Sequence, residues 1–144
     1  MALFRRIVVP VDFSEPSDHA LRVALDLARA LQAELTVLHV LEVPMYPYSG
    51  LGVAPVDLLT PAVEPAEQSL KALMATIPPP GAGSVLRIGT PVEQILAVAK
   101  ESQADLIVMG THGRRGVAHL FMGSVAERVV RTSPVPVLTV RGTP

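Results

Sequence analysis

The chain has 144 residues, of which 49% are hydrophobic, and its formal net charge at pH 7 is −1. This length predicts one domain with a substantial core, over residues 1–144, and the near-neutral charge gives no reason to expect nucleic acid as a partner. The absence of cysteine excludes disulfides, thiolate zinc sites and cysteine nucleophiles, and it fits a reducing compartment.

Residues 1–14 contain no apolar stretch long enough for a signal peptide before Asp12 intervenes. The longest weakly charged stretch, residues 43–63, is interrupted by Pro44, Pro47, Pro55 and Pro61. A membrane helix needs an unbroken hydrogen-bond ladder across about 20 residues. We therefore expect a cytoplasmic protein with no membrane partner.

The first half of the chain alternates strand and helix patterns. Residues 5–12, RRIVVPVD, form the continuous apolar run of a parallel strand buried on both faces. Residues 13–34 have helical periodicity, with Ser14 suited to the N-cap. Residues 34–40, ELTVLHV, predict a second strand. The segment from Val43 to about Pro61 is predicted to be a long, proline-rich loop.

The second half continues the alternation. It predicts helices over 65–77, 90–103 and 124–133 and strands over 84–89, 104–110 and 135–141. Thr90 and Glu93 have capping-box spacing at the start of the middle helix. Strands joined by helices require right-handed crossovers. The order therefore predicts an α/β fold: a doubly wound, Rossmann-like parallel sheet of five strands in the order 3-2-1-4-5, with helices on both faces.

Glycines follow the fourth predicted strand at fixed offsets. In GTHGRRGVAHLFMGS, Gly110 and Gly113 are separated by two residues, and nine residues then precede Gly123 and Ser124. Ligands of open α/β sheets bind beyond the carboxyl ends of the strands. Glycine permits positive φ and a close approach to the main chain, and the N–H groups at a helix start suit phosphate. The pattern predicts a phosphate cradle. A tight turn at Gly110 and a capping box from Ser124 to Glu127 are the structural alternatives.

Two better-known phosphate motifs do not fit. The chain has no GK[ST] sequence, which argues against a P-loop. The junction after the first strand, PVDFSEPSD, has no glycine, which argues against a dinucleotide fingerprint.

The spacing G-x2-G-x9-G-[ST] resembles the ATP-binding motif of the universal stress protein family, ATP-binding subgroup. The similarity extends over nearly the whole chain, through IVVPVDFSEPSDHAL, LTVLHV, DLIVMGTHGRRG and SPVPVLTVR. The resemblance implies that Asp12 lies beside adenine and ribose, that the backbone of Val40 meets the adenine edge, and that Ser124 and Val125 hold phosphate oxygens. The ATP-binding residues that it implies are Pro10, Val11, Asp12, Val40, Met109, Gly110, Thr111, His112, Gly113, Arg114, Arg115, Gly116, Gly123, Ser124 and Val125. It also implies Mg²⁺ or Mn²⁺ with the triphosphate, and a homodimer.

Several side chains near this motif have structural alternatives. Asp12 could cap the following helix as well as contact ribose. Arg114 and Arg115 match phosphate geometry, but loop arginines are often only solvated. His112 and His119 do not have a metal-ligand spacing, so no metal site is predicted from protein ligands.

The remaining two histidines predict no site: His19 is expected to be a solvated helix residue, and His39 a strand residue with a local hydrogen bond. Pro136 lacks an N–H donor and therefore places the last strand at a sheet edge or at the start of a strand. An apolar edge is an aggregation hazard. Pairing of Val135 to Val140 with a second copy would remove this hazard, and protection by Arg141 and the tail is the alternative.

The sequence shows no clear catalytic group. It therefore favours a nucleotide-binding module in which ATP changes the shape or partners of a homodimer in a stress response. Two alternatives stay open. One is a slow ATPase or phosphotransfer enzyme using the same pocket, with Asp12 as the carboxylate near it. The other is a protein-interaction scaffold that binds no nucleotide.

Overall fold

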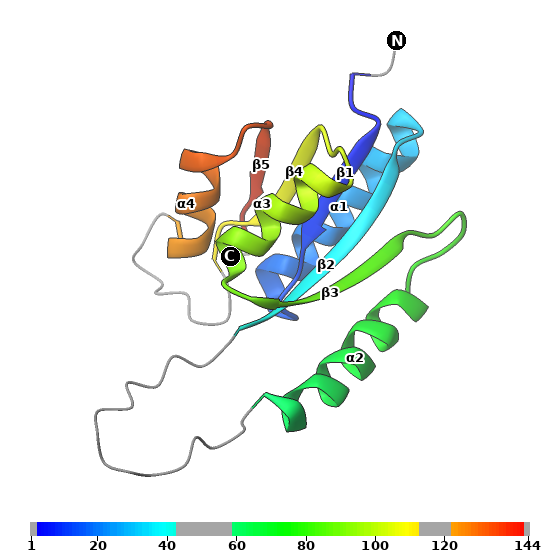
Figure 1. Ribbon diagram of the computed structural model, residues 1–144. Coiled ribbons are helices and arrows are strands. Elements are labelled where there is room, and N and C mark those ends of the chain that lie inside the picture. The colour runs from blue at the N-terminus through cyan, green and yellow to red at the C-terminus, as the bar shows by residue number, and fades with distance from the viewer. Residues whose placement is uncertain (1–2, 43–58, 113–121, 143–144) are drawn as a thin grey trace.

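The computed structural model describes residues 3–42, 59–112 and 122–142, and strands and helices alternate along them (Figure 1). The strands are β1 (Arg6–Pro10), β2 (Glu34–Glu42), β3 (Gly83–Gly89), β4 (Leu106–Gly110) and β5 (Val137–Val140). The helices are α1 (Glu15–Leu31), α2 (Thr60–Ala75), α3 (Pro91–Glu101) and α4 (Ser124–Thr132).

The strands form one parallel sheet in the order β3-β2-β1-β4-β5. This confirms the predicted fold and strand order. In β1, Ile7, Val8 and Val9 are at most 1% exposed. Successive residues of a strand point to opposite faces, so burial of all three requires cover on both sides of the sheet.

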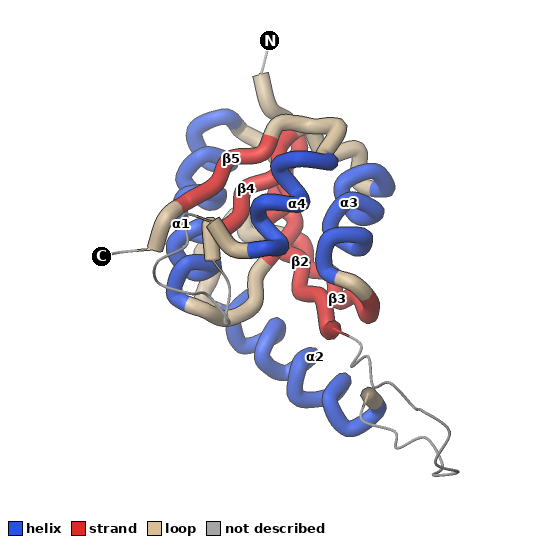
Figure 2. Tube along the Cα trace, turned by 90° about the vertical axis from the view of Figure 1, so that its left-hand side faces the viewer, coloured by secondary structure: helices blue, strands red, loops and turns tan. Residues whose placement is uncertain are grey.

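The cover consists of two helical layers (Figure 2). Ile7 and Val9 pack into a cluster with α1 and with Leu70 of α2, whereas Val8 packs into a second cluster with α3 and α4. Helix α1 presents small buried residues, including Ala20 and Ala24, to the sheet. Small side chains allow the helix axis to approach the strands closely, which positions the first turn of α1 at the ends of β1 and β4.

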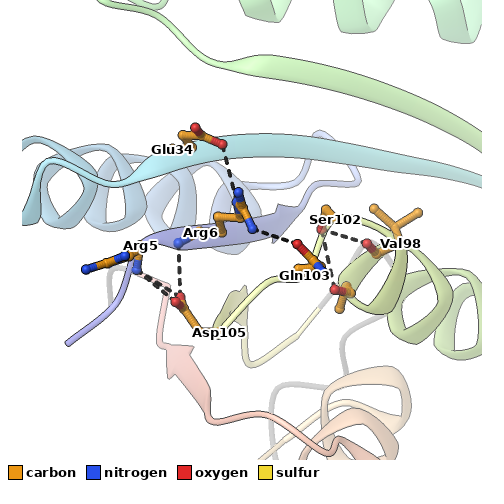
Figure 3. Close-up of polar contacts among 8 residues, drawn as sticks. Arg5, Arg6, Glu34, Val98, Ser102, Gln103 and Asp105 are labelled. Atoms are coloured by element: carbon orange, nitrogen blue, oxygen red, sulfur yellow. Dashed lines mark hydrogen bonds and ion pairs between the residues drawn. The ribbon is translucent and has the colours of Figure 1, made fainter. Parts of the chain in front are cut away.

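A polar network ties the strands together at their amino ends (Figure 3). The Asp105 carboxylate accepts hydrogen bonds from the main-chain N–H groups of Arg5, at 2.9 and 3.1 Å, and of Arg6, at 3.0 Å. The Arg6 side chain donates to Gln103 Oε1 at 2.9 Å and lies 3.6 Å from Glu34. The Asp105 carboxylate thus accepts from the N–H groups of Arg5 and Arg6, which come just before Ile7, the first residue of β1 that pairs with β4.

Helix α2 begins earlier than predicted. It starts at Thr60 and contains Pro65, where the sequence indicated a start at residue 65. Pro61 lies in the first turn, where an N–H group would have no acceptor within the helix. Pro65 lies in the second turn, where its missing N–H removes one helical hydrogen bond, and the helix continues past it. Residues 43–58 of the predicted loop lie outside the described residues.

Neither the predicted capping box at Thr90 nor the alternative one at Ser124 forms. Thr90 is the N-cap of α3, but its side chain makes no capping hydrogen bond. At α4 the N-cap is Gly123, so Ser124 is already the first helical residue and cannot form a box with Glu127. Glu127 instead forms an ion pair with Arg131 one turn further on.

In the ranges that the structure describes, no helix combines the length and apolar character that crossing a bilayer requires.

Candidate functional site

The carboxyl ends of β1 and β4 lie side by side at the point where the strand order reverses. From β1 the chain continues through α1 to β2 on one side, whereas β4 lies on the other side and continues outward to β5. Connections that leave in opposite directions open a crevice between the two strand ends. This switch point lies beyond Pro10 and Gly110, the last residues of the two strands.

Asp12 lies in the turn that leads from β1 into α1. Its Oδ1 accepts hydrogen bonds from the N–H of Ser14, at 3.0 Å, and from the Ser14 hydroxyl, while its own N–H donates to Ser17 Oγ at 3.2 Å. Ser14 is the N-cap of α1. Asp12 therefore supports the helix through the capping residue and is not the cap itself, which answers one of the two roles considered for it.

The main chain of Val40 faces the space beyond the end of β1. The ladder between β1 and β2 ends at the pair Pro10 and Leu38, and the N–H of Val11 then donates to Leu38 O at 2.7 Å. Main-chain groups of alternate residues point to the same side of a strand. The main-chain N–H and C=O groups of Val40 therefore point to the β1 side of β2, as the carbonyl of Leu38 does. They lie beyond Pro10, the last residue of β1 that pairs with β2.

Gly110 is required by packing against α1. A Cβ on Gly110 would lie 2.9 Å from the carbonyl carbon of Pro16 and 3.0 Å from its oxygen. Neither Gly110, which ends β4, nor Gly123, at φ −69°, has the positive φ that glycine would permit. The missing side chain at Gly110 therefore lets the first turn of α1 approach the end of β4.

Thr111 joins three elements at this end of the sheet. It is buried, its N–H donates to Val140 O at 2.9 Å, and its carbonyl accepts from the N–H of Gly123 at 2.6 Å. The Thr111 hydroxyl lies 3.1 Å from Nδ1 of His112. Thr111 thus holds the start of α4 against the carboxyl ends of β4 and β5.

The first turn of α4 presents main-chain N–H groups at the same end. The first hydrogen bond of the helix runs from the N–H of Glu127 to Gly123 O, at 2.9 Å. The N–H groups of residues 124–126 precede this bond, and the N-cap glycine has no side chain that could accept from them. Such a helix start combines donors with the positive end of the helix dipole and suits an anion.

The apolar residues of the predicted site line the sheet and helix beside this end. Met109 is 5% exposed and belongs to the core cluster beneath α3 and α4, against which Val40 and Val125 pack. Ser124 is exposed. Met109 therefore supports the site from within the core, while Ser124 is open to solvent.

Gly113, Arg114, Arg115 and Gly116 lie outside the described residues, as does His119. Two hollows formed by described residues lie elsewhere. One is bounded by α3 and the segment at Pro134 and Val135, and the other by Arg5, Gln32 and Asp105 at the amino ends of the strands. Neither contains a residue that the sequence assigned to the nucleotide.

Two histidines have more specific contacts than the sequence indicated. His19 is not simply solvated, because its Nδ1 donates to Arg141 O at 2.6 Å, which attaches α1 to the segment after β5. His39 lies on β2, and its Nδ1 is 2.7 Å from Val11 O, next to Asp12. Both partners are remote in the sequence, so periodicity along the chain held no signal for either bond.

The observed sheet order and layers define a doubly wound α/β protein whose strand order reverses between β1 and β4. The model of the universal stress protein family matches residues 3–141. The chain belongs to this family.

Individual relatives agree with this assignment over nearly the whole chain. A universal stress protein of Thermus aquaticus is 38% identical over 139 residues, which cover 96% of this chain and 100% of that protein. The solved structure of the universal stress protein UspA from Lactobacillus plantarum superposes with a TM-score of 0.83 at 29% identity, covering 98% of this chain and 100% of the other. A further solved universal stress protein, in complex with cAMP, has a TM-score of 0.70 at 26% identity, with 97% and 98% covered.

Proposed function

We propose that this chain binds ATP at the crevice between β1 and β4 and acts as a nucleotide-dependent module in a stress response. One observation carries the proposal: a helix start with N–H donors and a glycine N-cap is attached through Thr111 to the end of β4, the strand that pairs with β1. The phosphates would lie at Ser124 and Val125, with adenine and ribose toward Asp12.

The family relation supports a nucleotide as the ligand. One solved relative, 26% identical to this chain, binds cAMP, which contains adenine, ribose and phosphate. The spacing of Gly110, Gly113, Gly123 and Ser124 matches the family's ATP motif, and the resemblance also assigns Arg114, Arg115 and Gly116 to the phosphate loop.

A divalent ion would be held chiefly by the phosphates. The described residues contain no group of three or more His, Asp or Glu side chains that could hold a metal ion. Mg²⁺ is commonly bound through substrate phosphates and retained water, with few protein ligands. A Mg²⁺ or Mn²⁺ ion entering with ATP is compatible with this donor set, and it would neutralise phosphate charge.

The proposed homodimer forms through the edge strand β5 and its flank, Val135 to Val140. The Pro136 carbonyl accepts a hydrogen bond from the N–H of Ile107 in β4, and the Val140 carbonyl accepts one from the N–H of Thr111, which directly follows β4. By alternation, the main-chain groups of Val137 and Thr139 face away from β4, along the edge. The Leu138 side chain is 39% exposed on the same strand. A second copy of β5 would pair these groups and cover this side chain with two-fold symmetry.

Calorimetric titration of the purified chain with ATP and Mg²⁺ tests the nucleotide site. The discriminating variant is Ser124→Asp. An acidic residue in the first turn favours the helix dipole and so preserves α4, but it places negative charge where the phosphate would lie. We expect affinity to fall at least about tenfold while thermal stability is unchanged or rises.

Thr90→Asp is the matched control, because it adds the same charge at the start of α3, where Thr90 is exposed and makes no capping hydrogen bond. It should leave ATP affinity unchanged. Absence of binding heat for the unaltered chain at high micromolar ATP, or an equal loss in the two variants, would contradict the proposal. Phosphate release measured in the same samples separates binding from slow hydrolysis.

A further inference from the structure

The turn that carries Asp12 has an unusual main-chain conformation. Phe13, directly after Asp12, has φ of 64°. A bulky side chain rarely occupies this left-handed region, and it stays there only where the surrounding contacts impose it. The orientation of Asp12 therefore depends on groups that hold its two neighbours.

His39 contacts both neighbours of Asp12. Its Nδ1 lies 2.7 Å from Val11 O, and its ring centroid lies 4.5 Å from that of Phe13, with the planes tilted by 44°. Val11 itself is fixed to β2 by the bond from its N–H to Leu38 O, at 2.7 Å. The His39 side chain thus contacts the residue before Asp12 and the residue after it.

The hydrogen bond also defines the form of the ring. A carbonyl oxygen can only accept, so Nδ1 of His39 must carry the proton. In the neutral ring, Nε2 is then the unprotonated nitrogen. This tautomer is a property of the folded chain without any ligand, and it can be measured separately from nucleotide binding.

We infer that His39 is a positioning residue for the nucleotide site: it holds Val11 and Phe13 so that Asp12 faces the adenine and ribose. The inference rests on the proposed function, because it assigns His39 an effect on nucleotide affinity. Asp12 is joined on its other side to Ser14 and Ser17. Loss of the His39 contacts would remove the side-chain contacts that β2 makes with Val11 and Phe13, and the turn could then relax from the left-handed conformation of Phe13.

The test compares two substitutions of His39. His39→Phe keeps an aromatic ring beside Phe13 but has no donor for Val11 O. His39→Asn places an amide N–H at about the position of Nδ1. We expect the phenylalanine variant to lose about tenfold in ATP affinity, the lower end of the range for removing a group that orients a metal-binding side chain. The asparagine variant should stay close to the unaltered chain.

A structural effect is separated from positioning by combining each change with Asp12→Ala. If His39 acts through Asp12, His39→Phe should change affinity by less than about twofold when Asp12 is already absent. Equal losses in the two backgrounds would overturn the inference. His19→Phe is the control, because His19 also donates to a main-chain carbonyl, that of Arg141, away from Asp12; it should leave ATP affinity unchanged.

Long-range ¹H–¹⁵N correlation spectra of the ligand-free chain supply an independent readout. We expect Nδ1 of His39 to be the protonated nitrogen, and a ring protonated only at Nε2 would overturn the inference. Failure of the unaltered chain to bind ATP would overturn the proposed function, and with it the binding role of His39. Normal ATP binding with an unaffected His39→Phe variant would overturn only the role of His39.

Discussion

The close approach of Gly110 to the first turn of α1 predicts a large cost for a single methyl group. In Gly110→Ala, the new Cβ would lie 2.9 Å from the carbonyl carbon and 3.0 Å from the oxygen of Pro16, whereas ordinary contacts begin at 3.4 Å. The first turn of α1 would have to move by about half an ångström. Forcing a methyl group into a packed region costs about 1–3 kcal/mol, so we expect the free energy of unfolding to fall by about 2 kcal/mol.

Gly83→Ala provides the matched control, because Gly83 is also a strand glycine and its added Cβ would have no neighbour closer than Leu35 O at 4.0 Å. This change should be neutral or slightly stabilising, since alanine restricts the unfolded chain. Urea denaturation without nucleotide measures the free energy of unfolding of both variants, and thermal denaturation measures their melting temperatures. For a chain of this length, the alanine at residue 110 should lower the melting temperature by about 6 °C.

A second substitution identifies the atoms responsible. The two closest contacts of the added Cβ are main-chain atoms of Pro16, so Pro16→Ala should not restore stability to the Gly110→Ala chain. Equal stability of the alanine variants at residues 110 and 83 would refute the reasoning. Full rescue by Pro16→Ala would show that the proline ring, and not the main chain of α1, limits the approach.

Three further predictions concern the amino ends, a helix end and the sheet edge. Asp105→Ala removes the acceptor of the bonds from Arg5 and Arg6 and should lower the free energy of unfolding by about 2 kcal/mol in urea denaturation. Gln32→Gly should raise it by about 0.5 kcal/mol, because Gln32 ends α1 at φ 53°, which glycine adopts without strain; a loss of stability like that expected for glycine in a helix interior would contradict this. Leu138→Asp should abolish the proposed β5 homodimer, so that the variant sediments as a monomer in analytical ultracentrifugation while the unaltered chain sediments as a dimer. Ile88→Asp is its control, because Ile88 is 41% and Leu138 39% exposed on opposite edge strands; dissociation by both or by neither would contradict a β5 interface.

The sequence predicted the sheet well because its signals are local. The run at Ile7 to Val9 indicated a strand buried on both faces, and it is the central strand. The missing N–H of Pro136 indicated either a sheet edge or the start of a strand, and β5 both starts at the next residue and lies at an edge. Apolar periodicity and hydrogen-bonding capacity belong to each segment by itself, so they survive without knowledge of its neighbours.

Helix ends were predicted less well, because several residues compete for each role. Ser124 and Thr90 have the right chemistry for capping boxes, yet neither forms one. The carbonyl of Thr111 accepts a hydrogen bond from the N–H of Gly123. This bond fixes the residue that becomes the N-cap of α4. Which residue caps a helix depends on the path of the preceding loop in the folded chain. The spacing of residues in the sequence does not specify that path.

The sequence by itself indicated the alternation of strands and helices, the order of the strands in the sheet and the family. Only the tertiary structure showed that the main chain of Pro16 leaves no room for a side chain at Gly110. Only it showed that His39 forms a hydrogen bond to the residue before Asp12. The reason is physical: apolar pattern and backbone chemistry act within a segment, whereas a steric approach or a side-chain hydrogen bond exists only once remote segments have been brought together.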